Sequence, residues 1–395
     1  MPPQEETQQD EVIVQANEKT GHVSLRKSET RSSSFTNEGQ STVANKRWIL
    51  KQYPEGKFDA TRDVELETKT IDLLNKQTLL EQEDSLVVKV CAISVDAFIR
   101  TRMDKEAYHG GHAINEAVEA LGYGTVVLAG PKCGFKVGDE VLGLMPVAEY
   151  AVLRNSQGLN KKKTLPRASP TSSLGMLGIS GLAAYIGMFV APPKGPQKGD
   201  VVVVSAASGA VGSLAAQMAK QAGAAKVIGV AGGAHKKDYL LNTLKLDGAV
   251  DYKHPDKSIE EQLDELCPDG IDFFFDNVGG TLLDAVLKRI RIHGRVCVCG
   301  AASQYDTGAI NNKSKILGPS HYIMLAEKSA SMTGYNMMHY SRKFGEAIAY
   351  LAWHYYRGTI QLQEQVENGI EAFPRALEKL FSGGHCGRLI VKFSV

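Results

Sequence analysis

Four consecutive valines at residues 201–204 run directly into the sequence Ser-Ala-Ala-Ser-Gly-Ala-Val-Gly at residues 205–212. A short run of β-branched apolar residues is typical of a parallel strand that is buried on both faces. Gly209 and Gly212 lack a Cβ atom where a turn must approach a ligand and where the next helix must pack on the strand. Apolar positions at helical spacing follow, up to Gly223. The pattern predicts a strand, a turn and a helix whose first amides bind the pyrophosphate of a dinucleotide, although an ordinary strand-turn-helix unit without a nucleotide also fits it.

The next predicted strand, residues 226–230, indicates which dinucleotide is bound. An NAD enzyme places Asp or Glu about twenty residues past the glycines, where the acid binds the ribose hydroxyls. Residues 231–237 contain no acid and carry Lys236 and Lys237. Either lysine can neutralise a 2′-phosphate, which predicts NADPH. The alternative that stays open is that both lysines only form the solvated start of a helix.

Length and composition exclude several classes of protein. The chain has 395 residues, of which 43% are hydrophobic and 23% charged, so it can bury a large core and divide into two domains. Its net charge of +1 gives no reason to expect nucleic acid as a partner. No apolar stretch reaches the roughly 18 residues of a membrane span, so no membrane partner is expected. The six cysteines show no framework spacing, which favours a reducing, cytoplasmic location.

Composition and pattern predict four segments. Residues 1–45 are polar and are expected to be a disordered extension without a secretory signal, although import into an organelle through it stays open. Residues 46–172 alternate short strand-like runs with turns, which predicts a β-rich domain. Residues 173–340 alternate strands with helices, which predicts a parallel sheet. Residues 341–395 are expected to return to the β-rich domain.

Four strings carry a family resemblance, at residues 205–212, 251–253, 275–280 and 299–305. In this order and spacing they resemble the zinc-independent branch of the medium-chain dehydrogenase/reductase superfamily. Within it the chain is similar to the NADPH-dependent alkenal double-bond reductases and the leukotriene/prostaglandin reductases, over about residues 48–395. The resemblance implies an α/β fold with a Rossmann doubly wound parallel sheet and a GroES-like β-rich domain, commonly assembled as a homodimer.

The resemblance also implies site residues. It places Lys236 on the 2′-phosphate, Tyr252 near the adenosine phosphate and Asn277 in a turn that lines the cofactor. Segments around Cys299 and Tyr335 would line the nicotinamide half. The full set of predicted cofactor-binding residues is Ser208, Gly209, Ala210, Val211, Gly212, Gly232, Lys236, Tyr252, Asn277, Cys299, Gly300, Ser303, Tyr305, Tyr335, Asn336, Met337 and His385.

No metal is predicted. Zinc-dependent relatives need a cysteine, a Gly-His-Glu run and a further cysteine or acid, because three protein ligands must leave one coordination position open. Where that run would stand, residues 119–124 read Glu-Ala-Leu-Gly-Tyr-Gly. His109 and His112 form the only close histidine pair, and we interpret them as part of a polar loop.

Without a metal to polarise a carbonyl, reduction of a conjugated double bond remains accessible. Hydride can go to the β-carbon of an enal or enone, and the enolate that forms needs hydrogen-bond donors and a proton. Tyr305 is the predicted catalytic residue, because a phenol near the nicotinamide ribose can donate to the oxyanion or organise a water that protonates the α-carbon. The alternative is that Tyr305 is a half-buried packing residue.

The predicted function is therefore NADPH-dependent reduction of the carbon-carbon double bond of 2-alkenals and enones, including prostaglandin-type enones. An NADPH quinone oxidoreductase of the same superfamily and a non-catalytic NADPH-binding regulator stay open as alternatives. Two departures from the family bear on this. Phe98 stands where the family's D-P-Y-M-R string has tyrosine, and His385 stands where an asparagine commonly meets the cofactor. The charge state of His385 near pH 7 stays open at this point.

Overall fold

A computed structural model describes most of the chain. The described residues are 14–16, 23–25, 42–73, 83–105, 107, 110–154, 158–162, 168–305, 316 and 318–393. The chain forms two units, residues 1–41 and residues 42–395, and each is described by itself. In the first unit, β1 (Val14–Ala16) pairs antiparallel with β2 (Val23–Leu25). The prediction for His109 lies outside the described residues. Within residues 1–41, so does the predicted extension apart from β1 and β2.

The predicted extension, residues 1–45, ends earlier than its composition indicates. Strand β3 (Thr42–Leu50) begins inside this segment and pairs antiparallel with β4 (Val64–Asp72). Asn45 supplies the physical reason, since it is only 5% exposed. Its Nδ2 donates to the Tyr150 carbonyl at 3.0 Å and its Oδ1 accepts from the Tyr150 amide at 2.8 Å. A polar residue that looks typical of a disordered segment therefore joins two strands.

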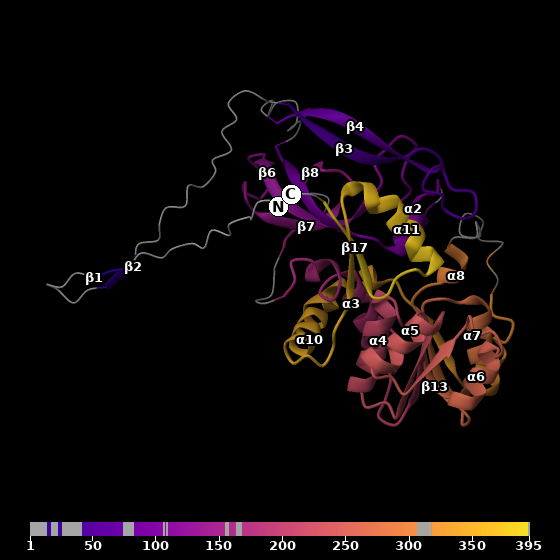
Figure 1. The fold of residues 1–395 in the computed structure, drawn as a ribbon. Coiled ribbons are helices and arrows are strands. Elements are labelled where there is room, and N and C mark those ends of the chain that lie inside the picture. The colour runs from indigo at the N-terminus through magenta and orange to yellow at the C-terminus, as the bar shows by residue number, and fades with distance from the viewer. Residues whose placement is uncertain are drawn as a thin grey trace, which may run out of the picture. The chain divides into compact units, whose positions relative to one another are not determined.

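A six-stranded parallel sheet forms one part of the second unit (Figure 1). Its strands are, in spatial order, β12 (Gly248–Asp251), β11 (Lys226–Ala231), β10 (Val201–Val204), β13 (Ile271–Asp276), β14 (Ile290–Val298) and β15 (Ser331–Gly334). Every neighbouring pair is parallel. Within this sheet, the first strand in the sequence is β10, in the middle. The next strands, β11 and β12, lie on one side of it, and β13, β14 and β15 lie on the other side. This order is that of a doubly wound sheet, which confirms the predicted Rossmann fold.

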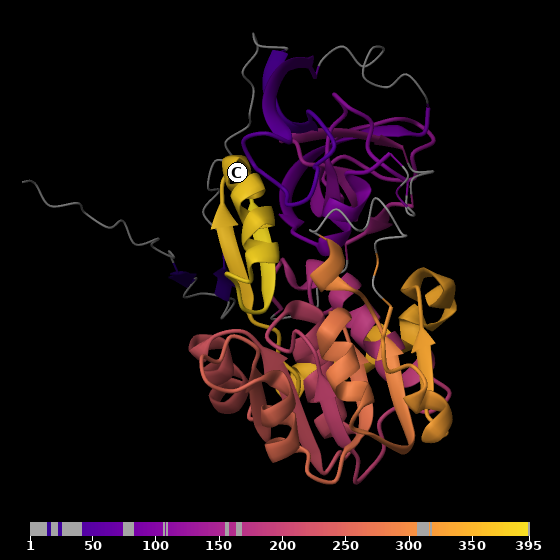
Figure 2. The same cartoon turned by 90° about the vertical axis from the view of Figure 1, so that its right-hand side faces the viewer.

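Helices cover both faces of this sheet (Figure 2). They are α3 (Ile179–Tyr185), α4 (Ala210–Gln221), α6 (Ile259–Leu266), α7 (Gly280–Leu287) and α10 (Phe344–Tyr356). The short helix α5 (Ala234–Asp238) follows β11 and has no buried residue. Val202 and Val204 pack in a cluster with residues of α3, α4 and α10. Val203 packs in the opposite cluster with residues of α6 and α7. The valine run is therefore buried on both faces, as its composition predicts.

A seven-stranded sheet forms the β-rich part. Its main path is β16 (Glu364–Asn368), β17 (Arg388–Lys392), β5 (Ser85–Ser94), β6 (Glu119–Ala129), β7 (Glu140–Pro146) and β9 (Asn160–Lys161), and β8 (Tyr150–Arg154) pairs with β5. Helices α2 (Ala97–Arg102) and α11 (Phe373–Ser382) belong to the same part of the fold. Two short helices, α8 (Ala302–Tyr305) and α9 (Met324–Glu327), lie between β14 and β15 in the sequence. Strand β17 pairs antiparallel with β5, so the last strand of the chain lies in the β-rich sheet.

The return to this sheet begins later than residue 341. Helix α10 buries Ala347 and Leu351 in the cluster that also contains Val202 and Val204 of β10. This helix therefore belongs with the parallel sheet, and the β-rich part resumes at Glu364 with β16. An apolar helix face predicts burial, but its sequence does not indicate which of two cores it covers.

Phe274→Ala is predicted to lower the free energy of unfolding by about 3–5 kcal/mol, because removal of the ring leaves a cavity. Phe274 lies on β13 and is fully buried against residues of helices α6 and α7. The control is Ile292→Ala, because Ile292 is 67% exposed and its truncation is expected to change stability by less than about 0.5 kcal/mol. Urea unfolding followed by circular dichroism measures both variants. Equal losses in the two would contradict this account of the core.

Candidate cofactor and catalytic site

Close backbone contacts shape the turn between β10 and α4. A Cβ atom at Gly212 would lie 2.3 Å from the Ala206 carbonyl oxygen, so glycine is needed for α4 to approach the turn. Gly209 is the N-cap residue of α4 in an extended conformation, and no side chain caps the helix. The first amides of α4 therefore remain available to an anion. The predicted residues of this cradle are Ser208, Gly209, Ala210, Val211 and Gly212.

The loop after α11 closes one side of this cradle. The Gly387 amide donates to the Ser208 carbonyl at 2.7 Å, and Gly387 also forms a parallel bridge with Gly209. Gly387 has a φ angle of +71°, and a Cβ atom there would lie 2.0 Å from the Gln363 carbonyl oxygen. Sequence reasoning did not single out Gly387. The signal that could have found it is the group of glycines at residues 383–387 directly after a predicted helix.

Four predicted residues meet beside this loop. The ring of Tyr252 lies over Gly232, where a Cβ atom would come within 2.4 Å of the ring. A Cβ atom at Gly383 would lie 3.5 Å from Lys236 Nζ and 3.7 Å from Tyr252 Oη. His385 follows in the same loop, where the charge of Lys236 acts on its imidazole. The structure therefore brings Gly232, Lys236, Tyr252 and His385 together.

Among the described residues, no carboxylate balances the charge of Lys236 in this cluster. Burial lowers the pKa of the half-buried Lys236, and in the described part of the chain no carboxylate opposes that shift. Burial, assisted by the charge of Lys236, lowers the pKa of His385 to about 4, so the imidazole is neutral near pH 7. Its Nδ1 atom is buried and has no hydrogen-bond partner among the described residues. An uncompensated cation fits a phosphate group, and the unpaired ring nitrogen leaves a hydrogen-bonding position open.

Buried polar groups tie the carboxyl ends of β10 and β13 together. Asp276 is fully buried, and its Oδ1 accepts from the Val278 and Gly279 amides at 2.9 and 3.0 Å. Ser205 Oγ donates to the same carboxylate at 3.0 Å, and Asn277 Nδ2 donates to the Ser205 carbonyl at 2.7 Å. Burial raises the pKa of Asp276, and the three hydrogen bonds act against that rise. The predicted cofactor residue Asn277 thus uses its amide within the protein.

The segment after β14 is tied to the same place. The Cys299 and Gly300 amides both donate to the Asp276 carbonyl, at 2.7 and 3.1 Å. Ser303 Oγ donates to the Val278 carbonyl at 2.6 Å. Burial raises the pKa of Cys299 to about 11, which keeps it as a thiol near pH 7. The predicted residues Cys299, Gly300 and Ser303 therefore lie at the carboxyl edge of the parallel sheet.

Tyr305 ends helix α8 and turns back over Gly300. A Cβ atom at Gly300 would lie 2.8 Å from Tyr305 Oη. The Ala301 amide donates to that oxygen at 3.0 Å, so the phenol accepts this bond and keeps its own proton to donate. Burial raises the pKa of Tyr305, which keeps the phenol protonated near pH 7. Helix α8 lies beside α2, the helix that carries Phe98 (Figure 1).

The three predicted residues after β15 are engaged within the fold. Tyr335 Oη donates to the Ala183 carbonyl of α3 at 2.6 Å, and burial raises the pKa of this phenol. Asn336 Oδ1 accepts from the Met338 amide at 3.0 Å, and Met337 packs half-buried against the cluster beneath α3 and α10. Tyr335 also contacts Cys299. Tyr335 thus supports the segment of Cys299, and its hydroxyl already has a backbone partner.

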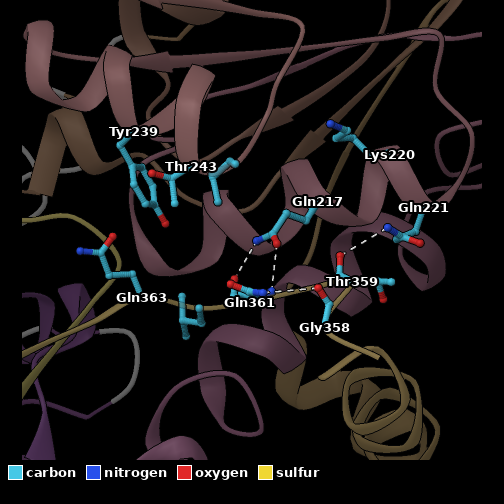
Figure 3. Close-up of a pocket in the computed structure, with 11 residues that line it drawn as sticks. Gln217, Lys220, Gln221, Tyr239, Thr243, Gly358, Thr359, Gln361 and Gln363 are labelled. Carbon is cyan, nitrogen blue, oxygen red and sulfur yellow. Dashed lines mark hydrogen bonds between the residues drawn. The ribbon is translucent and has the colours of Figure 1, made fainter. Parts of the chain in front are cut away.

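A cavity of about 490 Å³ has none of the predicted site residues in its lining (Figure 3). It is bounded by the second half of α4, a π-helical turn at Tyr239–Thr243 and the linker between α10 and β16. Gln217 forms part of its wall, where Nε2 donates to the Gln361 carbonyl at 2.8 Å and Oε1 accepts from the Gln361 amide at 2.9 Å. The cavity thus borders the linker that joins the two sheets, and it reaches Gln363, whose carbonyl oxygen lies close to Gly387.

No group of three or more His, Cys, Asp or Glu side chains within the described residues is placed to hold a metal ion. Likewise, no helix in the described part of the chain combines the length and apolar character needed to cross a membrane.

Comparisons with known proteins show which families and relatives the chain is similar to. Residues 46–161 match a family described as the N-terminal domain of oxidoreductase, and residues 210–353 match one described as zinc-binding dehydrogenase. The NADP(+)-dependent 2-alkenal reductase of Nicotiana tabacum is 36% identical, over 89% of this chain and 98% of that protein. Prostaglandin reductase 1 of Mus musculus is 33% identical, over 89% of this chain and 99% of that protein.

A solved structure extends the match to the fold. CurA from Vibrio vulnificus in complex with NADPH has a TM-score of 0.78 and 29% identity, covering 89% of this chain and 99% of that one. The relatives are matched over nearly their whole length, which includes both the β-rich part and the parallel sheet. The chain is therefore an oxidoreductase, and it belongs to the zinc-independent branch of the medium-chain dehydrogenase/reductase superfamily.

Proposed function

We propose that this protein uses NADPH to reduce the carbon-carbon double bond of α,β-unsaturated aldehydes and ketones. The relatives named as an NADP(+)-dependent 2-alkenal reductase and as prostaglandin reductase 1 support the substrate class. Lys236 supports the choice of NADPH, because it lies beside Tyr252 and Gly383 and no carboxylate in the described part of the chain opposes its charge. The cradle at residues 208–212 supports binding of the pyrophosphate. Homodimer assembly and a cytoplasmic location stay predictions.

The observation that supports the proposed reaction is that the phenol of Tyr305 is protonated and able to donate a hydrogen bond. NADPH, when bound, supplies the hydride. An enone that accepts hydride at its β-carbon gathers negative charge on its carbonyl oxygen and then needs a proton at its α-carbon. Burial raises the pKa of Tyr305, which keeps the phenol protonated although the hydrogen bond from the Ala301 amide acts against that rise. Because Oη accepts the Ala301 bond, the phenol O–H remains able to donate. The phenol can therefore donate a hydrogen bond to the oxyanion or hold the water that delivers the proton.

The direct test is NADPH consumption by the full-length protein with a medium-length 2-alkenal, run beside a quinone of similar size. We expect turnover with the alkenal that exceeds turnover with the quinone. Faster turnover with the quinone would replace the proposal with quinone reduction. NADPH binding without turnover of any enal, enone or quinone would overturn the proposed activity and leave a regulatory protein.

Lys236→Ala is predicted to weaken NADPH binding by about tenfold or more, because a charge-assisted contact to the 2′-phosphate is lost. Binding of NADH should stay unchanged, since NADH has no 2′-phosphate. The matched control is Lys237→Ala, because Lys237 lies on the same helix, α5. Titrations that follow nucleotide fluorescence measure all the dissociation constants. Equal weakening by the two substitutions would contradict the assignment of Lys236.

Tyr305→Phe is predicted to lower kcat for the alkenal by about 10²-fold, because it removes a hydroxyl donor and keeps the ring. NADPH affinity should change little, so steady-state rates at saturating NADPH measure the effect. Tyr150→Phe serves as the control, since Tyr150 lies on β8 in the β-rich sheet. If Tyr305→Phe turns over the alkenal as fast as the unaltered protein, the phenol has no part in the reaction.

A further inference from the structure

A buried ion pair joins two segments that lie far apart in the sequence. Arg388 is the first residue of β17, and Asp96 directly precedes α2. Arg388 Nη1 lies 2.5 Å from Asp96 Oδ1, and Nη2 lies 2.8 Å from Oδ2. The two side chains are only 3% and 9% exposed. Two parallel hydrogen bonds between planar groups fix the orientation of one segment against the other, which a single contact does not do.

Asp96 directs its carboxylate to Arg388 instead of to its own helix. It occupies the N-cap position of α2, where an aspartate commonly accepts from the amides of the first turn. Here its side chain makes no such capping bond. Ser94 Oγ donates to Asp96 Oδ2 at 2.7 Å, which further fixes the carboxylate. The start of α2 is therefore held by a residue from the other end of the chain.

The arginine side of the pair borders the nucleotide cradle. Arg388 follows Gly387, whose amide donates to the Ser208 carbonyl at 2.7 Å. The Arg388 amide itself donates to the Gln363 carbonyl at 2.7 Å. Gly383, at the start of the same loop, faces Lys236. Arg388 is thus anchored to the loop that closes the cradle.

The aspartate side of the pair borders the proposed catalytic residue. Helix α2 begins directly after Asp96 and lies beside α8, the helix that ends at Tyr305. Phe98, on the first turn of α2, packs half-buried against the core of the β-rich part. The placement of α2 against α8 therefore depends on where Asp96 is held.

We propose that Arg388 and Asp96 are a positioning pair, which couples occupancy of the nucleotide cradle to the placement of α2 against Tyr305. This inference rests on the proposed function for its choice of NADPH and Tyr305. The pair acts through the loop at residues 383–387 on one side and through α2 on the other. When NADPH occupies the cradle and restrains the loop, the ion pair carries that restraint to the start of α2.

Hydrogen exchange of the full-length protein, with and without NADPH, tests this coupling without any need for turnover. In the unaltered protein, saturating NADPH should slow exchange of the α2 amides by about fivefold or more. In Arg388→Lys the positive charge beside Asp96 remains and the two-point contact is lost. NADPH should then slow α2 by less than about twofold, while the dissociation constant of NADPH changes by less than about threefold.

The matched control is Arg295→Lys, because Arg295 pairs with Asp200 and both side chains are 12% exposed. This variant should show the full NADPH effect on α2. If thermal melting shows that Arg388→Lys does not fold, Ser94→Ala replaces it and should show a reduced effect. A full NADPH effect on α2 in Arg388→Lys, or in Ser94→Ala where that variant replaces it, would overturn the positioning role, as would no effect in the unaltered protein.

The two proposals can fail separately. At saturating NADPH, Arg388→Lys should also lower kcat/KM for the alkenal by about tenfold or more, because α2 is no longer held against Tyr305. Intact coupling in hydrogen exchange without alkenal turnover would overturn only the proposed reaction. Alkenal turnover with an unchanged response of α2 in Arg388→Lys would overturn only the positioning pair.

Discussion

Strand β10 is paired on both sides, and the geometry of the site depends on this placement. Because β10 lies between β11 and β13, their carboxyl ends meet at one edge of the sheet. Helix α4 starts there with amides that no side chain caps. Ser205 then ties the end of β10 to Asp276 and Asn277 at the end of β13. The segment of Tyr305 is attached to the same place through the carbonyl of Asp276.

Charge and protonation at this edge agree with the proposed chemistry. Lys236 supplies a cation beside Tyr252 and Gly383, and His385 adds no charge there near pH 7 because burial lowers its pKa to about 4. On the other side, Tyr305 and Cys299 keep their protons, since burial raises both pKa values. In the proposed reaction, the Lys236 cation would face an anionic ligand and the protonated Tyr305 would donate to an oxyanion.

Local patterns predicted the parts of the fold that local chemistry determines. Short-range geometry explains the valine run, the glycines at 209 and 212 and the lysine at 236. The structure brings the predicted residues near them together. Long-range contacts were not predictable in this way. The burial of Asn45 depends on Tyr150, and the hydroxyl of Tyr335 is engaged by Ala183.

The same reason explains the features that sequence reasoning missed. Gly387 donates a hydrogen bond to Ser208, and Arg388 pairs with Asp96. In each case the partner lies far away in the sequence. Helix α10 has an apolar face, but only packing shows that this face covers the parallel sheet. A single sequence records the chemistry of a residue and not the identity of its distant neighbour.

The position to which hydride is delivered tests the central claim most directly. The measurement is the reaction of the full-length protein with a 2-alkenal and NADPH that carries deuterium at the transferable position of the nicotinamide, followed by NMR of the product. The account predicts a saturated aldehyde with deuterium on its β-carbon. Deuterium on the carbinol carbon of an unsaturated alcohol would show that the carbonyl group is reduced, and it would contradict the account.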